Sequence, residues 1–175
     1  MLLIATVTTA VLFDVTGFIG GQTEQTSDET QSELTDRLDV VTATGTNITE
    51  LDSGERVVTE VELVVTGFDG ASPIDLRNVT IQWLASDSVT LSHAAAAGDD
   101  PAFETVALVD PDGSFPVVTN SNDRYAVRFQ PGQEFGDPLA EGQQVSLTIL
   151  TPGGATITEQ LRVPSSLLGK QTVEL

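Results

Sequence analysis

The sequence predicts an all-β sandwich or barrel preceded by an apolar N-terminal helix. Two observations predict this fold class. A nearly uncharged apolar run opens the chain, and short alternating segments rich in β-branched residues follow from about residue 37, separated by turn residues. Several short strands at such spacing are typical of a sandwich or barrel. The strand segments do not alternate regularly with helical segments, so a parallel sheet is not predicted.

Residues 1–21 form the predicted helix. Apolar side chains are nearly continuous from Met1 to Phe13, and no lysine or arginine precedes Arg37. The run is shorter than a membrane span of about 20 residues, and it lacks the basic region of a secretory signal. A helix that is apolar on all sides must be enclosed, so we expect it to pack among several helices; a truncated membrane anchor or signal remnant is the alternative. The side chains expected to pack are Leu2, Leu3, Ile4, Val7, Val11, Leu12, Phe13 and Phe18.

The remaining chain divides into an acidic segment and a β-domain. Residues 22–36 mix helix-forming residues with Ser and Thr, which indicates a helical extension or a linker. Residues 37–175 form the predicted outer domain, in which Trp83 alternates within an apolar run and is expected in the core. The tetra-alanine stretch 94–97 is expected in a loop or short helix. The segments with a strand pattern are 38–42, 56–67, 79–86, 88–92, 125–129, 144–151 and 155–163.

The charge of the chain restricts its partners. The formal net charge is −19, and Lys170 is the only lysine. Nucleic-acid binding requires a basic face that releases counterions, so nucleic acid is not an expected partner. The same repulsion argues against binding to an anionic membrane surface. Such acidity indicates a protein of concentrated salt solutions, where carboxylates are screened within a few ångströms; an ordinary solvated surface is the alternative.

The sequence contains no pattern specific to an enzyme. The chain has no cysteine and a single histidine, His93. Ser92 and Asp87 lie near it in sequence, but a catalytic triad requires separated groups brought together by the fold. Paired carboxylates are expected by chance among 26 acids. We therefore predict that the chain is not an enzyme.

No cofactor is predicted, although a structural cation such as calcium stays open. Asp110 and Asp112 resemble the start of a calcium loop, but Phe115 stands where such a loop needs glycine. A tight turn explains these residues equally well. Further oxygen ligands that the fold could add are those of Asp99, Asp100 and Glu104.

Two acceptor sequons for N-glycosylation occur in the chain. They are 47–49 (Asn-Ile-Thr) and 78–80 (Asn-Val-Thr). We expect modification only if the asparagine is exposed on an extracellular protein. Asn47 is the preferred candidate, because it is predicted to lie in a loop, whereas Asn78 is predicted at the entry to a strand.

An ordered set of segments resembles the haloarchaeal archaellins, which are archaeal flagellins. The segments are AVLFDVTGFIGG (10–21), LTDRLDVVTATG (34–45), PIDLRNVTIQW (73–83), VSLTILTPGGATIT (145–158) and RVPSSLLGKQTVEL (162–175). The resemblance implies a type IV pilin-like helix in the filament centre and an immunoglobulin-like β-sandwich outside. It also implies a non-enzymatic, extracellular archaellum subunit that polymerises with itself and paralogous archaellins, inserts transiently in the membrane, and is rotated by a membrane motor complex. Glycosylation is common in the family.

One departure concerns the beginning of the chain. Family precursors start with a short basic leader, followed by a mature apolar segment that precedes the part seen here. This chain begins at Met1 inside the expected helix. We interpret this as a start codon assigned too late.

Two other functions stay open at this point. A type IV adhesion pilin shares the helix and the β-domain, and differs in serving attachment. A secreted or anchored β-sandwich binding module, for example for carbohydrate, would present a row of exposed aromatics. The chain has one Trp and one Tyr, which does not favour such a module.

Overall fold

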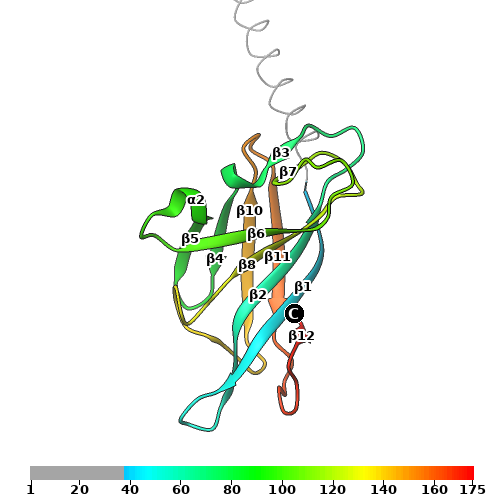
Figure 1. Cartoon of the computed structure of the whole chain (residues 1–175). Coiled ribbons are helices and arrows are strands. Elements are labelled where there is room, and N and C mark those ends of the chain that lie inside the picture. The colour runs from blue at the N-terminus through cyan, green and yellow to red at the C-terminus, as the bar shows by residue number, and fades with distance from the viewer. Residues whose placement is uncertain (1–37) are drawn as a thin grey trace, which may run out of the picture.

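Alternating β-branched and apolar residues build most of the described chain into strands. The computed structural model describes residues 38–175 (Figure 1). The strands are β1 (Asp39–Glu50), β2 (Arg56–Thr66), β3 (Ile74–Asp75), β4 (Thr80–Leu84), β5 (Ser88–His93), β6 (Ala102–Val109), β7 (Val117–Val118), β8 (Arg124–Phe129), β9 (Leu139–Ala140), β10 (Gln144–Leu150), β11 (Thr156–Arg162) and β12 (Val173–Glu174). Two short helices join them, the 3-10 helix η1 (Leu76–Asn78) and α2 (Ala94–Ala97).

The main sheet is continuous and curled. Its strand order is β11-β10-β4-β5-β6-β8-β2-β1-β12, β9 pairs with β2, and β3 with β7 form a separate two-stranded ribbon. The strands of the main sheet pair antiparallel except for β5 with β6. The sheet curls so that the half with β11, β10 and β4 lies behind the half with β8, β2 and β1 (Figure 1). The predicted β class is therefore confirmed.

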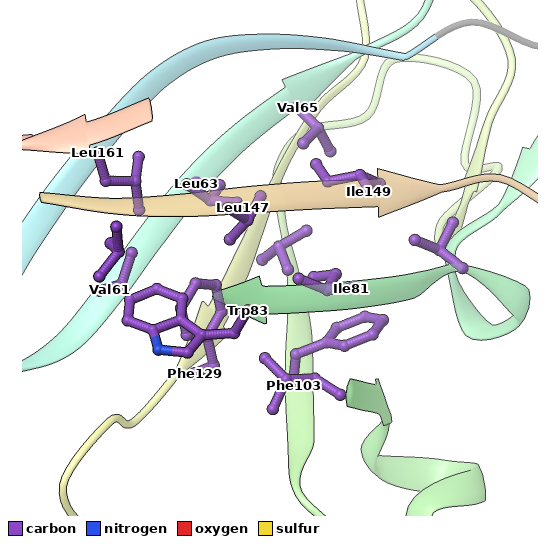
Figure 2. Close-up of a cluster of buried hydrophobic side chains, with 14 of the residues drawn as sticks. Val61, Leu63, Val65, Ile81, Trp83, Phe103, Phe129, Leu147, Ile149 and Leu161 are labelled. Atoms are coloured by element: carbon purple, nitrogen blue, oxygen red, sulfur yellow. The ribbon is translucent and has the colours of Figure 1, made fainter. Parts of the chain in front are cut away.

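The core lies between the two halves of the sheet. Figure 2 shows side chains from β2, β4, β8 and β10 meeting there. Trp83 is buried, and its indole lies edge-on to Phe129 at 5.5 Å and to Phe135 at 5.8 Å between ring centroids. Such edge-to-face pairs add to the gain from burying apolar area. The expected core position of Trp83 is confirmed.

Strand β1 differs from its prediction in both register and length. The pairing shifts between Val40, which pairs with Val65, and Thr42, which pairs with Val64. This bulge turns Val40 and Thr42 to opposite faces, so the predicted alternation of residues 38–42 is wrong. The strand also continues to Glu50, so the prediction that Asn47 lies in a loop is wrong as well.

Strand β6 has no counterpart among the predicted strands. Its sequence AFETVALV does not alternate cleanly, and the side chains of its last four residues are exposed. Apart from β1, the other long strands agree with their predicted segments to within two residues at each end, and the tetra-alanine stretch forms the short helix α2. The short strands β3, β7, β9 and β12 were also not predicted, because two residues carry no period.

The residues before 38 are not described. The predicted helix 1–21 and the acidic segment 22–36 lie outside the described residues. Within residues 38–175, no helix has the length and apolar character needed to cross a membrane.

Candidate functional site

Three carboxylates converge where β6 ends and β8 begins. Asp110 follows β6 directly, Asp112 lies two residues further on, and Asp123 precedes β8. One ligand oxygen from each of them lies within 4.8 Å of the others. We call these three residues the aspartate cluster. Charged groups that close repel each other unless a cation or hydrogen bonds compensate.

Asp123 is the most unusual member of the cluster. Its side chain is fully buried. Oδ2 accepts hydrogen bonds from the backbone N–H groups of Thr119 (2.8 Å) and Asn120 (3.2 Å). Oδ1 is buried without a hydrogen-bond partner among the described residues. A buried polar atom without a partner costs free energy and therefore requires an explanation.

The other two carboxylates organise the loop between β6 and β7. Oδ1 of Asp110 accepts from the backbone N–H of Ser114 (3.0 Å), and its Oδ2 accepts from that of Phe115 (3.2 Å). Oδ2 of Asp112 accepts from the Thr119 hydroxyl at 2.7 Å. Hydrogen bonds from Thr119 and then Ser114 lower the pKa of the Asp112 carboxyl. The loop therefore holds the carboxylates in a defined arrangement.

Tyr125 closes the inner side of this loop. Its hydroxyl donates to Oδ1 of Asp110 at 3.1 Å and lies 3.0 Å from the Ser114 hydroxyl. Burial raises the pKa of the Tyr125 phenol to about 12, and the neighbouring acids act in the same direction. The phenol is therefore held in its neutral, hydrogen-bond-donating form.

The aspartate cluster fits a hard divalent cation. Carboxylate oxygens are the ligands that calcium and magnesium prefer, and the unpartnered Oδ1 of Asp123 is a free acceptor. No salt bridge within residues 38–175 reaches these carboxylates, since the pairs found there are Arg56–Glu50, Arg77–Asp75 and Arg128–Glu62. Arg124 is adjacent to Asp123, but its Nη1 donates to Thr66 and to the carbonyl oxygens of Ser121 and Asp123.

Sequence reasoning identified part of this cluster and missed its central member. Asp110 and Asp112 were singled out as the start of a calcium loop, whereas the fold supplies Asp123 as the third carboxylate, and not Asp99, Asp100 or Glu104. Asp123 lies 11 residues beyond Asp112, in a sequence, NSNDR, that reads as an ordinary turn. No signal in the sequence marks it as buried.

His93 has a structural environment. Its Nδ1 accepts a hydrogen bond from the backbone N–H of Ala95 at 3.1 Å and so caps α2. In the neutral ring the proton then sits on Nε2, which donates to the Thr105 hydroxyl at 3.0 Å. The ring also lies edge-on to Phe103. These contacts occupy both ring nitrogens, so the position of His93 is explained by a structural role and does not require a catalytic one.

Both sequon asparagines are exposed, but in different settings. Asn47 lies inside β1 with a left-handed backbone (φ 51°), and its carbonyl accepts from the Thr59 hydroxyl at 2.8 Å. Asn78 ends η1, and the third sequon residue Thr80 opens β4, which agrees with the predicted entry to a strand. Both asparagine side chains are open to solvent.

The fold matches solved filament proteins of archaea. FlaB1, an archaeal flagellin from Methanocaldococcus jannaschii, superposes with a TM-score of 0.63 at 20% identity, over 79% of this chain and 95% of that one. The archaeal flagellum of Methanospirillum hungatei superposes with a TM-score of 0.54 at 18% identity, over 94% of this chain and 90% of that one. The β-domain therefore has the fold of archaeal filament subunits.

The sequence comparison gives the family itself. Residues 1–161 match the profile of the archaeal-type flagellins, so the chain belongs to the archaeal-type flagellin family. Flagellin A2 of Halobacterium salinarum is 32% identical over 177 residues, and flagellin A2 of Haloferax volcanii is 28% identical over 194 residues. The first alignment covers 100% of this chain and 88% of the relative, and the second covers 97% and 86%.

Family membership decides the general function. The chain is a structural subunit of the archaellum, an extracellular filament, and it assembles with paralogous flagellins. The family consists of structural subunits and not of enzymes. The adhesion-pilin and binding-module alternatives are not favoured.

Proposed function

We propose that the chain polymerises through residues 1–21, which form an apolar helix that packs against the same helices of neighbouring subunits along the filament axis. The almost uninterrupted apolar run before Asp14 supports this proposal, because a helix without a polar face requires neighbours on all sides. Removing that surface from water stabilises packing by about 25 cal/mol for each Å². In this arrangement residues 22–36 extend or link the helix, and residues 37–175 form an immunoglobulin-like outer domain.

A paired substitution tests the proposed polymerisation helix. Replacing Val7 and Val11 with Asp places two charges inside the helix bundle and is expected to abolish filaments while the β-domain stays folded. The matched control replaces two exposed leucines of the β-domain, Leu84 and Leu150, with Asp. Electron microscopy of cell-attached and sheared filaments gives the readout. Filaments that persist in the Val7/Val11 variant contradict the proposal.

The assembly route is part of the same proposal. The apolar helix inserts transiently in the membrane before assembly, and the archaellum motor complex then rotates the finished filament. Strains that lack the motor complex are expected to accumulate the wild-type chain in the membrane fraction. Recovery of the chain from the soluble fraction of such strains would argue against the membrane step.

Glycosylation of Asn47 and Asn78 is proposed on the outer surface of the filament. Exposure of both asparagine side chains supports it, as does the extracellular location. Mass spectrometry of peptides from sheared filaments is expected to show a glycan on at least one site. Asn47→Gln and Asn78→Gln are the matched variants, and unmodified peptides at both positions in wild-type filaments would refute this part.

A second proposed role belongs to the aspartate cluster, which binds a divalent cation and so fixes the loop between β6 and β8. The observation that carries it is the buried, unpartnered Oδ1 of Asp123 next to two further carboxylates. A cation bound there would join residue 110 to residue 123 and stiffen this surface of the outer domain.

A further inference from the structure

The second half of β6 presents an apolar surface to solvent. Strand β5 pairs only with Ala102 and Phe103, so the rest of β6 has β8 as its one neighbour in the described sheet. Val106 pairs with Ala126 of β8, which in turn pairs with Val64 of β2, so these side chains share the face that points away from the core. Val109 and Leu108 are 49% and 46% exposed. Val109 pairs with Arg124, two residues from Ala126 on β8, and so lies on the same face. We call Val64, Val106 and Val109 the β6 face.

Acidic residues border the β6 face at its Glu104 end, where Glu62 and Glu104 flank Arg128, whereas Arg124 lies opposite Val109 at the other end. Residues 105–109 carry no charge, but Glu104 precedes them and Asp110 follows directly. Glu62 lies on the same face and binds Arg128 at 2.6 Å, so this arginine is already paired. An exposed apolar sheet surface on a chain with a net charge of −19 is suited to a partner that is apolar at its centre and basic at its edge.

The described part of the chain itself carries such a complement in the loop before β12. The backbone N–H of Lys170 donates to the carbonyl of Leu167 at 3.1 Å, and Gly169 supplies the positive φ (70°) of this turn. Leu167 is fully buried and anchors the turn, whereas Leu168 is 77% exposed. Lys170 is exposed, and no salt bridge within residues 38–175 involves it. The turn thus presents one large apolar side chain beside an unpaired cation.

The two surfaces lie on different parts of the domain. The loop before β12 is at the lower end in Figure 1, whereas β6 continues toward β7 at the other end. A contact between these surfaces on two molecules is heterologous. Repeated without closure, a heterologous contact produces an open polymer and not a closed dimer.

We propose that the turn 167–170 of one subunit docks on the β6 face of a second copy in the filament, with Leu168 against the valines and Lys170 against the acidic edge. The inference rests on the filament function and specifies how outer domains contact each other. It adds a contact with an apolar centre and a salt-sensitive edge to the contact proposed for the N-terminal helices.

Disulfide trapping tests this contact directly, because the chain contains no cysteine. A variant with Val106→Cys and Leu168→Cys is expected to form filaments that yield a ladder of covalent multimers on denaturing gels after mild oxidation. Each single variant is expected to remain monomeric on the gel. The control pair combines Leu168→Cys with Leu84→Cys, an exposed position on β4, and is expected to give no ladder.

The outcomes separate the docking proposal from the polymerisation proposal. Filaments without a ladder in the 106/168 pair overturn the docking contact and leave polymerisation intact. Dimers from Val106→Cys alone overturn it in favour of a symmetric contact. Loss of filaments in both the 106/168 pair and the control pair indicates an assembly defect caused by the cysteines. In that case the salt dependence of Lys170→Glu filaments decides whether the contact exists.

Charge reversal gives this independent test. When the salt concentration is lowered, Lys170→Glu filaments are expected to dissociate at a higher salt concentration than wild-type filaments. Once the attraction of Lys170 is removed, more salt is needed to screen the repulsion between the acidic subunits. Adding Glu104→Lys is expected to restore the wild-type midpoint. Arg162→Glu changes the net charge equally on an exposed position of β11 and is expected to have a smaller effect. Equal shifts for Lys170→Glu and Arg162→Glu overturn the contact.

Discussion

Asp123 illustrates how a fully buried carboxylate is arranged in this domain. Two backbone N–H groups hold one oxygen, and the other oxygen has no partner among the described residues. Without a cation the unpartnered buried oxygen of Asp123 is destabilising; with a bound cation it would become a ligand. In the proposed cation site, the contribution of Asp123 to stability would therefore change sign when the cation binds.

Calcium is expected to raise the melting temperature of wild-type filaments at constant ionic strength, because a ligand bound only by the folded state stabilises it in proportion to RT ln(1 + [L]/Kd). Asp123→Asn is expected to abolish this response. Asp99→Asn, at an exposed position outside the cluster, is the control and is expected to retain it. Scanning calorimetry with added calcium chloride measures both. An unchanged calcium response in Asp123→Asn would rule out the aspartate cluster as the site.

Tyr125 predicts a loss of stability in strong alkali. The phenol has its pKa raised from 10.0 to about 12 in the folded chain, mainly by burial. Below pH 10 the phenol is protonated in both the folded and the unfolded chain, and its contribution to the free energy of unfolding is fully present. Between pH 10 and 12 the phenol ionises in the unfolded chain but stays protonated in the folded chain, so the free energy of unfolding falls. Tyr125→Phe is expected to lose about 1 kcal/mol at neutral pH with its hydrogen bonds. It should also remove the extra decline between pH 10 and 12, and urea titrations across this range compare the two chains.

At the level of elements, β1 depends on a close approach at Gly45. A Cβ built on Gly45 would lie 2.9 Å from a methyl carbon of Val58 and 3.2 Å from one of Val173. The glycine therefore lets β12, at the C-terminal end of the described chain, pair with β1. Gly45 is needed for space and not for an unusual backbone angle.

Gly45→Val is expected to lower the free energy of unfolding by about 1 to 3 kcal/mol, because inserting methyl groups into a packed site forces its neighbours to move. Val41→Ala, at an exposed position of β1, is the control. Gly70→Ala is unsuitable as a control, because the φ angle of Gly70 is positive. Thermal unfolding followed by circular dichroism measures both variants. Equal stabilities would show that the C-terminal strand adjusts without cost.

The elements divide into those that local sequence predicts and those that it does not. Residues 60–65 of β2 and 144–150 of β10 alternate because one of their faces is buried, and both strands were predicted. Strand β6 was missed because half of it lacks a buried face, so the alternation that reveals strands is absent. The bulge in β1 was missed because it depends on pairing with β2 and not on the residues of β1 alone.

For the whole molecule, charge dominates the expected dependence on solvent. A net charge of −19 on 175 residues repels itself, and the described ion pairs lie at the surface, where they contribute little. The screening length falls from about 10 Å at 0.1 M salt to about 3 Å at 1 M. Stability is therefore expected to increase with salt concentration.

Filaments are expected to melt at a higher temperature in molar potassium chloride than in 0.1 M potassium chloride. Potassium sulfate at equal ionic strength is the control. Sulfate also strengthens apolar burial, so it is expected to raise the melting temperature further than chloride does. Differential scanning calorimetry of sheared filaments gives the comparison. A melting temperature that falls with salt would show that ion pairs outweigh the repulsion among carboxylates.

Local composition and period were sufficient for the β class, the core position of Trp83, the acidic surface and the absence of an enzymatic pattern, because each depends on residues close together in the chain. The meeting of Asp123 with Asp110 and Asp112, the bulge in β1 and the exposed face of β6 depend on which strands pair. Pairing joins residues far apart in sequence through a curled sheet. Its geometry is set by the packing of the whole core, which no local pattern encodes.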